Sequence, residues 1–140
     1  MLERTVILVK PDGVKRGLIG KIISRFEEAG FKMISAKFIW LTDEILNQWY
    51  AHHKDKDFFP SLLAFMKETP VLAMIWQGEG IIVKAREICG ATDPKKAAPG
   101  TIRADFGTEV QRNIIHVSDS QEASQKEISL IFSPEEILGY

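Results

Sequence analysis

The sequence predicts an α/β domain in which helices cover a four-stranded sheet. Short apolar runs of strand length alternate along the chain with segments whose apolar residues recur at helical spacing. The chain has 140 residues, 45% of them hydrophobic and 26% charged, which is enough for one domain with a buried core. It shows no internal repeat, low-complexity segment or linker, so we expect a single domain over residues 1–140.

The chain begins with a strand and a helix. Residues 5–9 (TVILV) are apolar and largely β-branched, which predicts a strand, and the turn-forming residues 11–13 (PDG) stop it. Between residues 19 and 26, isoleucine and phenylalanine recur at helical spacing and predict a helix. Gly30 then provides the stop that is common at a helix C-terminus.

A long strand and two helices follow. Residues 31–41 alternate as a strand does, with odd-numbered side chains on one face and even-numbered ones on the other. Thr42 and Asp43 offer N-caps for a helix that continues to Tyr50. A second, short helix is expected over residues 59–67.

In the middle of the chain, Pro70 opens a strand over residues 71–76, and residues 81–89 predict a helix that ends at Gly90. Over residues 91–112 the pattern fades, because two prolines and a glycine interrupt it beyond the helix. An unstructured loop of this length in a compact domain is more often a binding loop than a passive connection.

The last segments complete the alternation. Residues 113–118 predict a fourth strand and residues 120–132 a helix. Residues 133–136 (SPEE) carry a capping box with proline at the first helical position, so a last short helix follows. The order β-α-β-α-β-α-β fits a ferredoxin-like layout, although periodicity does not give the order of strands within the sheet.

The charge composition argues against some classes of function. With 18 basic and 19 acidic side chains, the net charge is −1, whereas a general nucleic-acid coat needs a dominant basic field. A small basic pocket for one phosphorylated ligand remains compatible with this balance.

A cytoplasmic location is expected. Cys89 is the single cysteine and is interpreted as a small buried apolar side chain, so no intramolecular disulfide forms and a reducing compartment is indicated. The N-terminal residues lack the shape of a signal peptide, and the longest apolar stretch, residues 71–76, is far too short to span a bilayer.

A histidine on the fourth predicted strand is the first candidate for chemistry. Strand alternation places Ile115 and Val117 on one face and Ile114, His116 and Ser118 on the other. The strand ends next to the start of a helix, and the free N–H groups there attract phosphate.

A carboxylate on the following helix is the second candidate. Ala123, Glu127, Leu130 and Ile131 fall on one stripe of that helix, so Glu127 interrupts an apolar face. A buried carboxylate needs a hydrogen-bond partner, and the His116 imidazole is a plausible one. The alternative, in which Glu127 lies at the rim and faces water, stays open at this point.

The remaining histidines do not suggest a metal site. His52 and His53 are adjacent near a probable helix end, and no Cys or His cluster has ligand spacing. We interpret them as a helix C-terminal feature beside the charged residues 54–57, and we expect no metal ligands among the side chains.

Several basic residues are candidate phosphate binders, although a solvated surface charge is the ordinary role of each. Lys10 is the strongest, because it ends an apolar strand, and strand ends in α/β sheets commonly border the ligand crevice. Arginine suits phosphate because its planar fork can donate two hydrogen bonds at once. The arginines in question are Arg86, Arg103 and Arg112.

Three separated segments, in this order, resemble the nucleoside diphosphate kinase family. Residues 3–22 (ERTVILVKPDGVKRGLIGKI) look like the family's opening, residues 90–107 (GATDPKKAAPGTIRADFG) like its substrate loop, and residues 112–120 (RNIIHVSDS) like its active-site segment. The resemblance extends along nearly the whole chain, and three motifs in the right order are far more specific than any one of them.

The resemblance implies a ferredoxin-like fold with a four-stranded antiparallel sheet covered by helices. It also implies transfer of the γ-phosphate of a nucleoside triphosphate, such as ATP, to a nucleoside diphosphate, by a ping-pong route through a phosphohistidine. By match to the motif, His116 is the nucleophile, Glu127 helps to orient it, and Ser118 forms a hydrogen bond near that pair. Lys10 matches a further catalytic position.

The resemblance further implies how the substrate is held. The positions that match those holding the phosphates or the sugar hydroxyls are Lys10, Tyr50, Arg86, Thr92, Arg103 and Asn113. Phe58 matches the aromatic residue that stacks on the base, and Val110 the apolar residue on its other face. Mg²⁺ is expected to arrive bound to the nucleotide phosphates, because no acidic cluster is dedicated to it. A homo-oligomer, either a tetramer or a hexamer, is also implied.

Two features depart from the family pattern. Val117 stands where glycine or alanine is more usual, and a β-branched side chain crowds its neighbours and does not easily take a positive φ. We therefore expect it to narrow the space around His116. The sequence ends at Tyr140 without the longer tail of larger members.

Two other classes of function stay open. In the first, a nucleotide-binding or regulatory module, His116 never becomes phosphorylated, and the fold alone does not exclude this. The joint presence of His116, Ser118, Glu127 and Lys10 argues against it. The second is a nucleic-acid-binding or scaffold protein, which the balanced charge disfavours as a main role.

Overall fold

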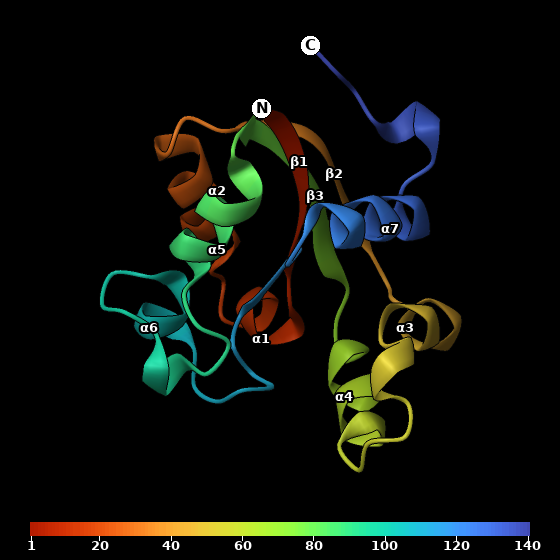
Figure 1. Ribbon diagram of the computed structural model, residues 1–140. Helices are drawn as coiled ribbons and strands as arrows, with labels where there is room; N and C mark the ends of the chain where they lie inside the picture. The colour runs from red at the N-terminus through yellow and green to blue at the C-terminus, as the bar shows by residue number, and fades with distance from the viewer.

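The computed structural model describes residues 1–140 and is built around an antiparallel sheet of order β2-β3-β1-β4 (Figure 1). This sheet, covered by helices, confirms the predicted fold class. The strands are β1 (Leu2–Val9), β2 (Lys32–Ile39), β3 (Val71–Glu79) and β4 (Ile115–Val117). The α-helices are α1 (Pro11–Lys15), α2 (Ile19–Glu28), α3 (Asp43–Trp49), α4 (Phe59–Met66), α5 (Ile81–Cys89), α6 (Ile102–Phe106) and α7 (Gln121–Ile131). Short 3₁₀ helices are η1 (Ala51–His53), η2 (Pro94–Lys96) and η3 (Pro134–Glu136).

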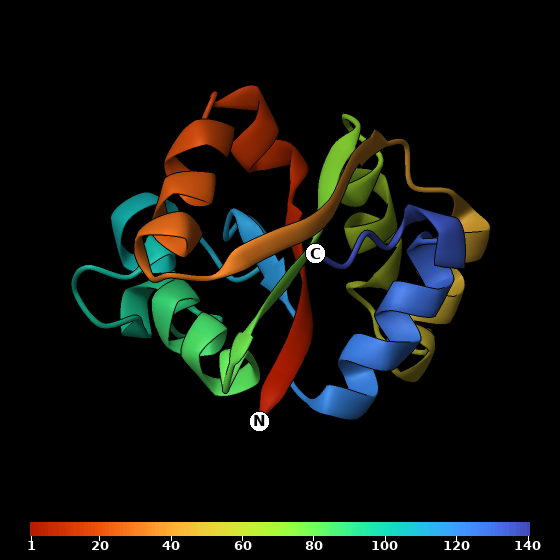
Figure 2. The same cartoon turned by 90° about the horizontal axis from the view of Figure 1, so that it is seen from above.

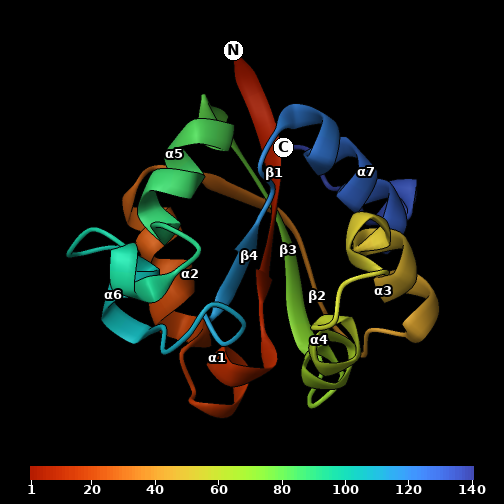
Figure 3. The ribbon, with the colours of Figure 1, turned by 60° about the horizontal axis from the view of Figure 1, so that its bottom comes forward.

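Helices lie on both faces of the sheet. Figures 2 and 3 show α3, α4 and α7 on one side, and α2, α5 and α6 on the other. Each face has its own buried apolar cluster, and β1 contributes to both: Val6 and Leu8 to the first, Ile7 and Val9 to the second. Because both faces of the second half of β1 are covered, residues 6–9 are a continuous apolar run without polar alternation.

The N-cap predicted at Thr42 and the capping box predicted at Ser133 and Glu136 are present, and Ser120 forms a further cap. The Thr42 side chain accepts a hydrogen bond from the Ile45 amide over 3.2 Å at the start of α3, and Ser120 accepts one from the Ala123 amide over 3.0 Å at the start of α7. These bonds satisfy amides that have no partner within the helix. None of the helices combines the length and the apolar character that crossing a lipid bilayer requires.

Residues 11–13 form the start of helix α1 and not a simple turn, so this part of the sequence-based prediction was wrong. Pro11 occupies the first helical turn, where its missing N–H costs nothing. A helix of five residues is too short to be stable alone, and tertiary contacts hold it. The buried carboxylate of Asp12 accepts a hydrogen bond from the Ile114 amide over 3.0 Å, which joins α1 to the segment before β4.

The strict alternation predicted over residues 31–41 is interrupted by a β-bulge. The register of β2 on β3 shifts between Met33 and Ser35. Met33 therefore packs with the α2–α5 cluster, whereas Ile39, an odd-numbered residue like it, packs with the cluster on the opposite face. A bulge inserts one residue, and this exchanges the faces that the following side chains occupy.

The segment 91–112 also contains more structure than the sequence predicted. It includes η2 and α6, each begun by a side-chain cap. Asp93 accepts a hydrogen bond from the Lys95 amide over 3.0 Å, and Thr101 accepts one from the Ala104 amide over 3.2 Å. Helix α6 packs against both η2 and α5, which fixes the segment along one wall of the site described below.

Strand β4 is shorter than predicted, because Ile114 has a φ of 77° and breaks the strand. Its side chain is consequently buried with Ile115 and Val117 and does not share the face of His116, as the alternation had predicted. This conformation is unusual for a β-branched residue and typically costs about 1–3 kcal/mol. Two hydrogen bonds hold it: the Ile114 amide donates to the Asp12 carboxylate, and the Ile114 carbonyl accepts from the Lys10 amide over 2.8 Å.

Candidate active site

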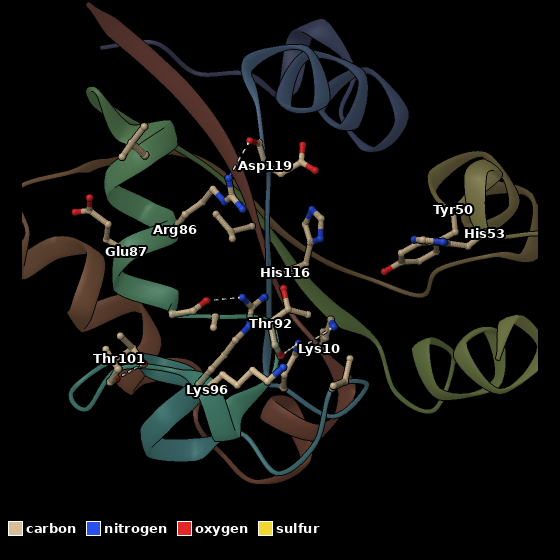
Figure 4. A pocket seen from close by; sticks show the side chains of 18 residues that line it. Lys10, Tyr50, His53, Arg86, Glu87, Thr92, Lys96, Thr101, His116 and Asp119 are labelled. Carbon is tan, nitrogen blue, oxygen red and sulfur yellow. Dashed lines mark hydrogen bonds between the residues drawn. The ribbon is translucent and has the colours of Figure 1, made fainter. Parts of the chain in front are cut away.

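A cavity of about 880 Å³ lies along the outer edge of β4. Most of the residues that the sequence singled out line it, and they come from α5, α6 and β4 and from the segments that follow β1, α3, α5 and α6. They are Lys10, Tyr50, Arg86, Thr92, Arg103, Val110, Asn113 and His116. Figure 4 shows His116 near the centre, with Tyr50 and His53 on one side and Arg86, Thr92 and Lys96 on the other.

His116 is held by a carboxylate from α7. Its Nε2 atom lies 3.0 Å from Oε1 of Glu127, and the Ser118 hydroxyl donates to the same oxygen over 2.7 Å. Ser118 also accepts a hydrogen bond from the Val6 amide over 3.0 Å, which connects the group to β1. Glu127 is buried, so the interpretation in which it faces water was wrong.

The contact between His116 and Glu127 determines which ring nitrogen of His116 is free. An ionised carboxylate only accepts hydrogen bonds, so Nε2 of His116 carries the proton when it bonds to Glu127. In the neutral imidazole, Nδ1 then keeps its lone pair, and it has no hydrogen-bond partner in the protein. The arrangement therefore presents Nδ1 as a nucleophile.

Two aromatic residues at the end of α3 lie beside the histidine. The Trp49 and His116 ring centroids are 4.9 Å apart, with an interplanar angle of 77°. Tyr50 lines the cavity, and its pKa is raised by burial and by the nearby charge of Glu127. The Tyr50 hydroxyl therefore stays protonated at neutral pH and can donate a hydrogen bond to a ligand.

Lys10 is buried at the cavity wall, where a chain of hydrogen bonds positions it. Its ammonium group donates to Oδ1 of Asn113 over 2.8 Å, and the Asn113 amide group donates to the Thr92 carbonyl over 2.9 Å. Burial and, to a smaller extent, the Arg103 charge lower the pKa of Lys10 to about 8. A cation in this position is incompletely compensated and attracts a phosphate group.

Arg103 is a second buried cation. It donates to the Gly90 carbonyl over 2.9 Å and to the Ile115 carbonyl over 2.7 Å, while its Nε is buried without a partner. Burial lowers its pKa as well. Arg86 makes only a long contact, 3.4 Å, with the Asp119 carbonyl, so its guanidinium retains most of its donors for a ligand.

Arg112, a candidate from the sequence, does not line the cavity. It forms an ion pair with Glu68 over 2.9 Å, and its guanidinium lies over the Phe65 ring, 4.5 Å from the ring centroid. The hydrogen bond from Arg112 lowers the pKa of Glu68, with a further contribution from Lys15. This residue therefore has a structural role, which is the ordinary role for a charged side chain at the surface.

His53 is a cavity residue that sequence reasoning missed, although it does lie in the last turn of a helix, η1, as expected. It lines the cavity, and its Nδ1 is buried without a partner. Burial is the main cause that lowers its pKa. Phe58 does not line the cavity directly: its ring lies against His53, with centroids 5.4 Å apart, and is half-exposed. No periodicity in the sequence marks His53, because η1 is only three residues long.

The lining residues suit a polyanionic ligand. Lys10, Arg86, Lys96 and Arg103 contribute cations, whereas Glu87 and Asp119 are the only carboxylates. A histidine nucleophile among several cations is the arrangement that phosphoryl transfer needs, because positioning and charge compensation supply most of the catalysis. Cys89, as expected, is buried and unpaired, and burial raises its pKa to about 12.

Comparison with known proteins agrees with this chemistry. A family model described as nucleoside diphosphate kinase matches residues 3–137. A nucleoside diphosphate kinase of Bacillus cereus is 51% identical over 99% of this chain and 94% of the relative, and one of Carboxydothermus hydrogenoformans is 52% identical over 99% and 93%. Among solved structures, a halophilic nucleoside diphosphate kinase from Halobacterium salinarum in complex with CDP has a TM-score of 0.96 at 44% identity and covers 100% of this chain and 93% of its own. The Aquifex aeolicus enzyme has a TM-score of 0.94 at 44% identity and covers 99% and 100%.

Proposed function

The chain belongs to the nucleoside diphosphate kinase family, and from this premise we propose that His116 carries the phosphoryl group between two nucleotides. The family's activity is phosphate exchange between nucleoside tri- and diphosphates. The observation that supports the assignment to His116 is its bond to Glu127, which leaves Nδ1 as the free ring nitrogen in a cationic cavity. We propose that residues 1–140 act as one domain in this reaction.

In the first half-reaction, Nδ1 of His116 attacks the γ-phosphorus of a nucleoside triphosphate. The N–P bond forms as the bond from phosphorus to the β–γ bridging oxygen breaks, and the nucleoside diphosphate leaves. In the second, a terminal oxygen of another nucleoside diphosphate attacks the phosphohistidine, and His116 is released. Glu127 keeps its hydrogen bond to Nε2 throughout and compensates the positive charge that develops on the ring.

The cations and polar groups of the cavity are proposed to hold the phosphates and the sugar. Lys10 and Arg103 are buried and approach the transferring group, where the charge of a loose transition state is spread over its oxygens. The remaining polar side chains proposed to bind the nucleotide are Tyr50, Arg86, Thr92 and Asn113.

The base is proposed to lie between apolar side chains at the open end of the cavity. Val110 lines the cavity and is exposed. Phe58 lies just outside the lining, against His53, and is proposed to stack on the other face of a base that extends beyond the cavity mouth. Stacking distinguishes bases weakly, since every base has a π-face, so several nucleotides serve as substrates. The Halobacterium salinarum relative is described in complex with CDP, which supports a nucleotide as the ligand.

Mg²⁺ is proposed to enter with the nucleotide. The cavity has two carboxylates, Glu87 and Asp119, and no cluster of three or more potential metal-ligating side chains is present in the chain. This donor set fits an ion that the phosphates hold and that retains most of its waters. When bound, the ion neutralises part of the phosphate charge.

We also propose that the protein assembles as a homo-oligomer, either a tetramer or a hexamer, in the cytoplasm. β2 is an outer strand of the sheet, and its neighbouring side chains Phe38 and Trp40 are 54% and 60% exposed. An outer strand with large apolar side chains is a surface that a second copy can cover. Light scattering tests this assembly. Wild type should be an oligomer, and Trp40→Glu, which places a charge on the proposed contact surface, should form a smaller species. A monomeric wild type contradicts the proposal. The unpaired Cys89 supports a reducing location.

Intact-mass spectrometry tests the proposed nucleophile. Wild type, His116→Ala and His52→Ala are mixed briefly with ATP and Mg²⁺ at neutral pH. We expect an acid-labile gain of one phosphate in wild type and His52→Ala but not in His116→Ala, and its loss on addition of GDP. NMR of the denatured adduct then identifies the isomer, which should be phosphorylated at Nδ1. Bound nucleotide without an adduct in wild type contradicts the proposal and favours a regulatory module.

A further inference from the structure

Trp49 is an aromatic residue at the active site that the proposed mechanism does not use. It is the last residue of α3 and is 6% exposed. Its ring meets the His116 imidazole at a centroid separation of 4.9 Å and an interplanar angle of 77°. Such T-shaped contacts between rings contribute about 0.5–1.5 kcal/mol beyond the area that they bury.

We propose that Trp49 is a positioning residue for phosphoryl transfer, which packs against the His116 ring and keeps Nδ1 directed at the substrate. The inference rests on the proposed function of His116. A single hydrogen bond from Nε2 to Glu127 fixes one atom of the imidazole but leaves the ring plane free to tilt. The indole restricts this tilt, because a rotated imidazole collides with it.

Trp49 acts from the side of the imidazole that faces away from the nucleotide. It is not among the residues that line the cavity of about 880 Å³. It lines a smaller cavity of about 260 Å³, together with Glu127, and His116 is one of four residues that border both spaces, with Tyr50, Val117 and Asp119. Trp49 therefore influences the reaction through His116 and not through contact with the nucleotide.

The hydrogen bond between His116 and Glu127 is largely shielded from water, since the two side chains are 18% and 12% exposed, and the indole contacts one of them. A hydrogen bond to a charged group is stronger when water is excluded, because the local dielectric constant is lower. Trp49 belongs to the buried apolar cluster that includes Leu8 and Leu46, and Leu8 is the residue opposite His116 in the pairing of β1 with β4. The rigid core on this face of the sheet thus extends as far as the nucleophile.

Rapid-quench measurement of phosphohistidine formation from labelled ATP tests the proposal. In Trp49→Met, which keeps an apolar side chain without a ring, we expect a rate about 10-fold to 100-fold below wild type, the loss that a misplacement of about 1 Å can cause. The half-saturating ATP concentration should stay within about twofold of wild type. Trp49→Phe retains a ring and should restore most of the rate. Leu46→Ala, in the same helix and cluster, controls for loss of packing in α3.

A spectroscopic readout separates positioning from a merely structural effect. In ¹⁵N NMR, the His116 imidazole of wild type, Trp49→Phe and Leu46→Ala should be the tautomer protonated at Nε2. The imidazole of Trp49→Met should instead show a mixture of the Nε2-protonated and Nδ1-protonated tautomers. The proposal is overturned if Trp49→Met keeps the wild-type rate and the wild-type tautomer. It is also overturned if Leu46→Ala loses as much rate as Trp49→Met. If Trp49→Met does not fold, a loss above 10-fold in a folded Trp49→Phe overturns it instead. Absence of phosphohistidine in wild type contradicts the proposed function itself.

Discussion

Nζ of Lys10 donates a hydrogen bond of 2.8 Å to Oδ1 of Asn113, although 103 positions separate the two residues in the chain. The bond directs a buried ammonium group along the cavity wall, next to the segment that leads into His116. Burial lowers the pKa of Lys10 to about 8, so its charge is lost at a pH at which an exposed lysine is still fully protonated.

The first prediction is an alkaline limb in the pH profile. Below pH 8 Lys10 is cationic and attracts phosphate, and above it the free enzyme loses this charge. We therefore expect kcat/KM, which reports ionisations of the free enzyme, to fall as the pH rises through about 8. The limb in kcat should lie at higher pH, because bound phosphate favours the protonated amine.

Lys10→Gln provides the control for this profile. It should have low activity at every pH and no limb near pH 8. Stability gives a second readout with a determined sign: the pKa in the folded state lies below the ordinary value of 10.5, so the unfolded chain binds the proton more tightly. The wild type should therefore gain stability relative to Lys10→Gln as the pH rises from about 8 to 10.5. If the difference in stability between wild type and Lys10→Gln does not change over this pH range, the pKa of Lys10 is not lowered in the folded protein.

The second prediction concerns Glu127. Glu127→Gln keeps the size of the side chain and removes the charge that supports the His116 ring. We expect the rate of phosphohistidine formation to fall by about 10- to 100-fold, with little change in nucleotide affinity, as is typical for the loss of a residue that orients a reactive imidazole. Glu122→Gln is the matched control, because Glu122 lies in the first turn of the same helix and is exposed. Full activity of Glu127→Gln in rapid-quench experiments contradicts the proposed role.

The third prediction concerns Val117. Its φ is negative, so the backbone conflict expected from a β-branched residue does not arise at this position: Ile114 carries the positive φ. The Val117 side chain does line the cavity next to His116. Val117→Ala should raise kcat/KM by a few fold, because it widens the space for the phosphoryl group, and should cost about 2 kcal/mol of stability for the two methyl groups lost.

The comparison for Val117 is Val71→Ala. Val71 is fully buried in β3 and does not line the cavity. Denaturant unfolding should show a similar loss of stability for both variants, whereas steady-state kinetics should change only for Val117→Ala. An unchanged or lower kcat/KM in Val117→Ala shows that the valine does not restrict the site.

The fourth prediction concerns Gly90, which ends α5 with a φ of 87°. A Cβ atom at this position would lie 2.7 Å from Cβ of Thr101, the residue that caps α6. Gly90→Ala should therefore lower the unfolding temperature and cost about 1–3 kcal/mol. Because the Gly90 carbonyl accepts a hydrogen bond from Arg103, nucleotide affinity measured by calorimetry should also weaken.

Gly100→Ala is the matched control for Gly90. Gly100 has a φ of 90°, and nothing lies within 4 Å of the position that a Cβ atom would take. The two variants share the backbone strain, and only Gly90→Ala adds a collision. We expect a smaller loss of stability in Gly100→Ala and no change in affinity, so equal effects exclude the contact with Thr101 as the cause.

Local patterns in the sequence predicted the long elements well. The apolar run in β1, the helical spacing in α2 and α5, the cap of α3 and the capping box of η3 all reflect interactions between residues close in the chain. The short helices α1 and α6 escaped detection, because segments of five residues have little intrinsic helicity and depend on tertiary contacts. The Thr101 cap was the one local signal for α6.

Two kinds of evidence in the sequence predicted the site: helical spacing and the resemblance to the family. Helical spacing alone suggested that Glu127 faces His116, and the distance of 3.0 Å confirms the pairing. The residues that surround the nucleotide cavity came from the resemblance to the family. Trp49 and His53 were not predicted, because their positions beside His116 and in the cavity depend on how α3 packs across the sheet, which no periodicity records.

The pairing of β1 with a short β4 also determines when this site comes into existence during folding. During synthesis, Lys10 emerges from the ribosome early, whereas its partner Asn113 and the segment with His116 emerge only after most of the chain has been made. Contacts at such sequence separation close large loops and form late, after local helices and hairpins. If His116 is the nucleophile, as proposed, a partly synthesised chain has Lys10 but no nucleophile, and it cannot take phosphate from nucleotides before β4 docks. Catalytic competence thus coincides with completion of the fold.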